Sequence, residues 1–245
     1  MTTATTLKAA TAALALLATP SFAQDTQRYV ENNLLAIFYH EMGHALIDVM
    51  QLPVFGQEED AADVLSVYLI DAFFEEDAAV EMAYDTAFGF LNDAEETGDD
   101  IPFWAVHGPD IQRYYNLVCL FYGANPDERG DVAEELDLPE DRAETCPEEY
   151  ELAADSWGPV LDEMENTSGK PLRFVPSGSD APSAKLLDAL MEAEVDDWNE
   201  YYAWPAQVEV RVIFCDEANA FYDPSERSIE MCVEYAEFLA ETAPD

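Results

Sequence analysis

The stretch Tyr39–Asp63 constrains this chain most, because it sets two histidines and several carboxylates at helical spacing. It opens with an H-E-x-x-H motif, His40 to His44, inside an apolar pattern of helical period that spans residues 25–51. A helix advances about 100° per residue, so His40 and His44 lie about 40° apart on one face, and both imidazoles can reach one ion. Glu41 lies beside that face, where its carboxylate can contact a water on the ion.

A third ligand is expected from a second helix, which the pattern predicts from Glu58 to about Phe74 after a break at residues 52–57. The short connection makes the two helices antiparallel neighbours. Catalytic zinc takes three protein ligands and keeps one position open. Glu59 is the preferred third ligand because Asp63 follows it on the same face. Glu58 competes, but it has no acidic partner four residues on.

Two carboxylates are expected to orient the ligand histidines. Asp63 can accept a hydrogen bond from the far nitrogen of a ligand histidine and so fix its tautomer. Asp48, four residues after His44, is expected to do likewise. Gly43 inside the helix costs about 1 kcal/mol relative to alanine, and we expect it to permit close approach of another element. The set predicts one Zn²⁺ ion.

The N-terminus predicts export. Lys8 is followed by an apolar run, Ala9 to Ala18, that is too short to span a bilayer. Ser21 and Ala23 are small residues at the two positions that a signal peptidase reads, so we expect a signal peptide at residues 1–23 with cleavage after Ala23. No later segment predicts a membrane span. The mature protein is expected to be periplasmic or extracellular.

Four cysteines fit an oxidising compartment, and their even number predicts two disulfides. Three pairings are open. The pairs Cys119–Cys146 and Cys215–Cys232 are favoured because each closes a local loop.

The net charge is extreme, since 53 Asp and Glu stand against ten Lys and Arg, a formal charge of −43. Such a surface repels nucleic acid and anionic membranes. The acidic residues are spread along the chain, which favours a solvated surface over a site for basic peptides or divalent cations.

The order of elements predicts one α+β domain over residues 24–245, mainly helical and with a small C-terminal sheet. Residues 24–165 form the helical part that carries the zinc site, and residues 184–245 form an α/β part after a turn-rich segment at 166–183. An acidic loop is expected at Asn92–Asp100 after a helix at 77–92, and the segment 125–147 is expected to be a polar connection. The clearest strand is Gln207–Phe214, where apolar residues alternate. A second strand is expected at 227–231, and a closing helix at 232–242.

The segment from His40 to Asp48, followed by the E-x-x-x-D of Glu59 to Asp63, resembles the thermolysin-type, glutamate-liganded zinc peptidases (gluzincins). More closely, the chain is similar to a bacterial family of uncharacterised metallopeptidases. The matching segments are His40–Ser66, Gln112–Tyr122 and Cys215–Cys232. The resemblance implies a zincin-like fold, a zinc cofactor and a peptide or protein substrate.

The resemblance extends to Asn219-Ala220-Phe221, which is similar to the edge strand that lines the cleft of these peptidases. There, asparagine and alanine meet the substrate backbone, which implies substrate contacts for Asn219, Ala220 and Tyr222. An exposed strand edge can bind an extended peptide as one more strand. A turn is the alternative, because Asn, Asp and Pro favour turns. In the gluzincins this strand precedes the zinc helix, whereas here it follows, as if the segment order were permuted.

These residues predict metal-assisted amide hydrolysis, with Glu41 as the general base. His107, the one histidine outside the motif, is the preferred donor to the oxyanion. The competing donors are Tyr114, Tyr115, Tyr222 and Arg113. The predicted function is an exported zinc peptidase. The alternative is a catalytically silent metal-binding or partner-binding secreted protein, while a structural zinc site is disfavoured because this ligand set leaves one position open.

Overall fold

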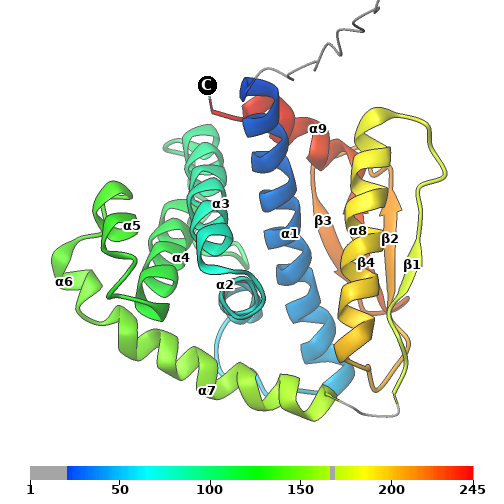
Figure 1. Ribbon diagram of the computed structural model, residues 1–245, viewed down its shortest axis with the longest axis horizontal. Coiled ribbons are helices and arrows are strands. Elements are labelled where there is room, and N and C mark those ends of the chain that lie inside the picture. Colours follow the sequence, from blue (N-terminus) through cyan, green and yellow to red (C-terminus); the bar gives the residue numbers. More distant parts are fainter. Residues whose placement is uncertain (1–20, 166–168, 245) are drawn as a thin grey trace, which may run out of the picture.

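A computed structural model describes residues 21–165 and 169–244 of the chain. The expected signal segment therefore lies outside the described residues up to position 20. Helix α1 (Ser21–Met50) runs through the middle of the fold, with the other helices of the N-terminal part on one side and the sheet on the other (Figure 1). A helix between two layers must be apolar on more than one face, and α1 buries Leu34, Phe38 and Met42 as well as Leu35 and Tyr39.

Helix α2 (Glu58–Phe73) packs against the second half of α1. The two helices lie very close together at Gly43, where an added Cβ atom would lie 2.9 Å from the Cα atom of Ala62. Any larger residue would push the helices apart. The glycine therefore allows the close approach that brings the first turn of α2 over the histidines of α1.

The rest of the helical part consists of α3 (Glu76–Thr97), α4 (Asp110–Ala124), α5 (Gly130–Glu135), α6 (Glu140–Ala143) and α7 (Cys146–Met164). The expected loop at Asn92–Asp100 is wrong up to Thr97, because α3 continues to that residue. It ends at Gly98, whose φ of 56° is a conformation that favours glycine. The expected polar connection at 125–147 contains two short helices.

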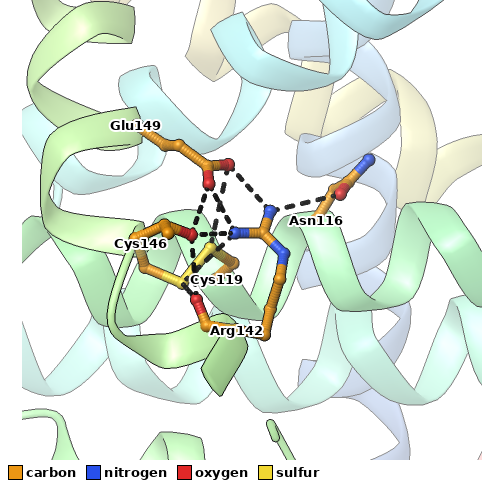
Figure 2. Close-up of a disulfide and its surroundings, with 6 residues drawn as sticks. Asn116, Cys119, Arg142, Cys146 and Glu149 are labelled. Carbon is orange, nitrogen blue, oxygen red and sulfur yellow. Dashed lines mark hydrogen bonds and ion pairs between the residues drawn. A yellow bond between two sulfur atoms is a disulfide. The ribbon is translucent and has the colours of Figure 1, made fainter. Parts of the chain in front are cut away.

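The disulfide Cys119–Cys146 joins α4 to the first residue of α7, in the local pairing that the sequence favours. Figure 2 shows Arg142 beside it, paired with both carboxylate oxygens of Glu149 at 2.6 and 2.7 Å. The side-chain amide oxygen of Asn116 accepts a hydrogen bond from the same guanidinium. The disulfide thus joins the start of α7 to α4, and the ion pair joins α6 to α7.

In the described part of the chain, four strands form one mixed sheet in the order β1-β2-β4-β3. Strand β1 (Arg173–Val175), which the sequence did not predict, pairs in parallel with β2 (Glu209–Ile213), and α8 (Pro182–Tyr201) forms the crossover between them. Strand β4 (Ser228–Cys232) pairs in parallel with β2. The predicted α+β class, mainly helical with a small C-terminal sheet, is confirmed.

Strand β3 (Ala220–Asp223) lies at the sheet edge beside α1 and is antiparallel to β4 (Figure 1). Its register places Ala220 and Tyr222 opposite the buried Met231 and Ile229, so both side chains point to the face that carries α1. The disulfide Cys215–Cys232 joins the segment before β3 to the end of β4, and α9 (Val233–Thr242) follows directly.

Among the helices of the described residues, none is long and apolar enough to cross a membrane.

Candidate metal centre and active-site cleft

Three side-chain atoms converge where α1 meets the first turn of α2. The Nε2 atoms of His40 and His44 lie 3.2 Å apart, and the Oε2 atom of Glu59 lies 3.3 and 3.2 Å from them. Tetrahedral zinc binds such atoms at about 2.0–2.1 Å, which places neighbouring ligand atoms about 3.3 Å apart. The triangle therefore has the size that one zinc ion requires. Across residues 21–165 and 169–244, no other group of three or more His, Cys, Asp or Glu side chains converges in this way.

Each histidine has a carboxylate at its other ring nitrogen. Asp63 Oδ1 lies 2.7 Å from Nδ1 of His40, and Glu58 Oε1 lies 2.8 Å from Nδ1 of His44. A proton held on Nδ1 leaves the Nε2 lone pair free to bind a metal. The expected role of Asp48 at His44 is wrong in this structure: Glu58 occupies that place, and Asp48 instead accepts a hydrogen bond from the Tyr222 hydroxyl at 2.7 Å.

Arg113 of α4 orients Asp63 in turn. Its guanidinium donates to both carboxylate oxygens of Asp63, at 2.8 and 2.9 Å, and lies 4.6 Å from the ring centroid of Phe90. Burial would raise the pKa of the Asp63 carboxyl, but Arg113 and His40 outweigh burial and hold that pKa well below its usual range. Asp63 therefore stays ionised while it holds His40. Arg113, which the sequence placed among the oxyanion donors, is occupied by this ion pair.

The charges at this point favour a cation. Burial favours neutral His40, yet hydrogen bonds to Asp63 and Glu59 outweigh burial and raise the pKa of His40 to about 9. His107, His40 and His44 hold the pKa of the Glu59 carboxyl far below its usual range. Ionised carboxylates around two imidazoles thus stabilise positive charge at the centre of the triangle, and a divalent metal supplies it.

Glu41 lies next to this centre with 5 % of its surface exposed. The backbone N–H of Tyr222 in β3 donates a hydrogen bond to its carboxylate, and burial raises the pKa of Glu41 above its usual value. A carboxylate with a raised pKa is a stronger base than an exposed one. The strand thus holds in place the side chain that the motif designates as the base.

The ligands and Glu41 line one cavity of about 1180 Å³. It follows α1 from Ile37 to Asp48, and residues 218–222 with Pro224 form another wall. Asn219, Ala220 and Tyr222 all line this cavity, so the structure brings the three expected substrate contacts to the metal centre. A strand from the far end of the chain thus forms one side of the site.

A family model that covers most of the chain agrees with this geometry. Residues 5–161 and 183–243 match the model of the family DUF4344, described as "putative metallopeptidase". The chain belongs to this family. No curated protein and no solved structure matches this chain.

In this metallopeptidase-family chain, His107 also reaches the metal centre. Its Nε2 atom lies 2.8 Å from Oε2 of Glu59, and its ring stacks on His40 with centroids 6.2 Å apart. Tyr114 points elsewhere, because its buried hydroxyl donates to the carbonyl of Leu136. Among the donors considered, His107, Tyr222 and Arg113 line the cavity, whereas neither Tyr114 nor Tyr115 does.

The roles of Glu58 and Arg113 at the candidate metal centre were not predicted. Glu58 was considered only as a ligand, and Arg113 only as an oxyanion donor. A signal for Arg113 did exist: Asp63 must stay ionised beside a histidine, and the chain has only ten Lys and Arg to pair with it. Which one pairs depends on how α4 packs against α2, and no local pattern gives that contact.

Proposed function

We propose that this chain is an exported, zinc-dependent peptidase of the gluzincin type. The observation that carries the proposal is the convergence of three parts in one cleft: a zinc-sized ligand triangle, a buried glutamate beside it and the open edge of a strand. The first part alone fits any zinc-binding protein. The second and third parts are those that hydrolysis of a peptide needs.

His40, His44 and Glu59 would hold the ion, and Asp63 and Glu58 would keep both imidazoles in the tautomer that binds it. When bound, zinc polarises a carbonyl oxygen and lowers the pKa of a water molecule to about 7. Glu41 removes the proton from that water and later gives it to the leaving amine. His107 donates a hydrogen bond to the oxygen of the scissile carbonyl as negative charge develops on it.

The substrate backbone would lie along β3. The N–H of Tyr222 points to Glu41 and so away from β4. Backbone groups of alternate residues point to the same side of a strand, so the carbonyl groups of Ala220 and Tyr222 lie at the open edge. An extended peptide can pair with these groups as an added strand. Such pairing would hold the scissile bond beside Glu41.

The gluzincin assignment includes a permuted order of segments. In that group the edge strand comes before the zinc helix, and here β3 comes after it in the chain while packing beside it in the fold. The contact of β3 with α1 supports the assignment, because function depends on the assembled cleft. Export is supported by the two disulfides, which persist in oxidising compartments.

The test measures cleavage of a library of internally quenched peptides by residues 24–245, with and without a chelator. The Glu41→Gln variant is assayed in the same way. The expected result is zinc-dependent cleavage that falls by roughly 10²–10⁴-fold in the variant, while zinc content is unchanged and the melting temperature does not fall. Glu95→Gln, which removes a charge from an exposed position of α3, is the matched control. Stoichiometric zinc without cleavage of any peptide would contradict the proposal and favour a metal-binding protein that does not turn over.

A further inference from the structure

The cleft continues beyond the metal centre toward the N-terminal half of α1. Between Ile37 and Asp48 it follows the helix for about 16 Å, enough for roughly five residues of extended peptide. The Ile37 end is lined by the last turns of α3, which carry Asp93 and Glu96, and by α9, which carries Tyr235 and Phe238. These four side chains have no part in the proposed chemistry.

Asp93 is half-buried at this end of the cavity. Among the described side chains, none donates a hydrogen bond to it, and none forms an ion pair with it. Burial and the neighbouring carboxylates of Asp110 and Glu96 outweigh the positive charge of Arg113 and raise the pKa of Asp93 to about 6. Arg113 lies nearby but is already bound by both oxygens of Asp63. Four carboxylates (Asp63, Asp93, Glu96 and Asp110) and the guanidinium of Arg113 together carry a net charge of about −3 when all are ionised.

The same end has aromatic walls. The rings of Tyr235 and Phe238 stack at 6.4 Å with an interplanar angle of 15°, and both side chains line the cavity. Aromatic faces attract a cation and pack against an aliphatic stem. Carboxylates beside aromatic walls fit the side chain of arginine or lysine. The aliphatic stem of such a side chain can pack against the rings, and its positive charge can pair with the carboxylates.

A metal ion fits this end poorly. The carboxylates of Asp93, Glu96 and Asp110 do not converge as a group of potential ligands within the described residues. An organic cation tolerates that separation, because a guanidinium spreads its donors over several directions.

We infer that this end of the cleft is a specificity subsite for a basic side chain of the substrate peptide, with Asp93 as the residue that selects it. The inference rests on the proposed peptidase function and names the class of its substrate. It also changes the interpretation of the acidic composition. Most carboxylates of the described residues face solvent, whereas Asp93 lines the cleft without an ion pair of its own.

The experiment compares blocked, internally quenched peptides that carry arginine or its neutral analogue citrulline, moved one position at a time on either side of the scissile bond. At one position, we expect kcat/KM to favour arginine by roughly tenfold or more. Asp93→Asn should reduce that preference to near equality. Glu95→Gln removes the same charge two residues further along α3, outside the cavity, and should keep the preference.

Cleavage with no preference at any position would overturn the inference, and so would an Asp93→Asn variant that keeps the wild-type ratio. If no peptide is cleaved, the peptidase proposal fails, and the subsite is then tested by calorimetry with the same peptides. Tighter binding of the arginine peptide than of the citrulline peptide, lost in Asp93→Asn, would support the subsite. Equal affinities would overturn it.

Discussion

At the metal centre each acidic side chain has a partner, whereas at the Ile37 end of the cleft Asp93 has no hydrogen bond or ion pair with a described side chain. Asp63 and Glu58 pair with His40 and His44, and Arg113 binds Asp63 from the other side. Asp93 faces neighbours of its own charge. Matched charges hold ligands in fixed positions, while unmatched charge favours binding of a cation from outside. The predictions below test whether the two ends differ in this way.

The largest effect is expected at the ligands. His44→Ala removes one corner of the triangle, so zinc affinity should fall by more than about 100-fold and peptide cleavage by more than about 10³-fold. Zinc content after dialysis, measured together with kcat/KM, tests this. Unchanged zinc content in the variant would show that the metal binds elsewhere.

His107→Ala should separate catalysis from metal binding at the same end. The loss of one donor to the oxyanion should lower kcat by roughly 10²–10³-fold, while the three ligands keep the metal. The measurement is kcat together with zinc stoichiometry. A variant that loses zinc would show that His107 serves as a ligand and not as a donor.

Asp63→Asn should lower the zinc affinity of the metal centre without abolishing zinc binding. An asparagine cannot provide the same charged acceptor to His40, so zinc affinity should fall by roughly 10–100-fold, as for other residues that orient metal ligands. Competition with a chromophoric chelator measures this change. Asp60→Asn on the same helix is the control, because Asp60 is exposed and contacts no ligand. Equal affinities of the two variants would show that Asp63 does not tune the metal.

The smallest effect is expected at the Ile37 end of the cleft. There, a substitution of Asp93 should stabilise the fold and not weaken it. The pKa of Asp93 is raised from 3.8 to about 6 in the folded state. A raised carboxylate pKa means that the folded state binds the proton more tightly, so stability falls as pH rises through this range. At pH 7, Asp93→Asn should therefore raise the free energy of unfolding by about 1–3 kcal/mol.

The gain from Asp93→Asn should shrink below pH 6 and vanish below pH 4, where the carboxyl is neutral in both states. Urea unfolding at pH 7 and pH 4 with the disulfides intact measures it. A variant that is less stable than the wild type at pH 7 would show that Asp93 has a partner after all.

The same comparison shows what the sequence could predict. Spacing within residues 40–63 predicted the ligand triangle, because helical periodicity and a short connection bring these side chains together. The partner of His44 was mistaken, since Asp48 and Glu58 both satisfy the local spacing and only the packing of α1, α2 and β3 decides between them. Strand β1 is three residues long and lies in a turn-rich segment, so no pattern marked it.

The Ile37 end was hidden for a related reason. An acidic loop was expected where α3 in fact continues, and that extra helix places Asp93 and Glu96 in the cleft. The acidic composition predicted a solvated surface. Charges spread along the chain do not show which carboxylates lie in a cleft of the fold. The aromatic walls come from α9, far from α3 in sequence, so only the assembled fold brings the two together.

The central claim is that His40, His44 and Glu59 bind one ion on which peptide cleavage depends. The most direct measurement is a titration of the metal-stripped mature chain with Zn²⁺, followed at once by calorimetry and by cleavage of a quenched peptide. The predicted result is one tight site per chain, with activity that rises in proportion and levels off at one equivalent. Tight binding that persists in a His40→Ala, His44→Ala double variant, or activity that does not follow the ion, would contradict the claim.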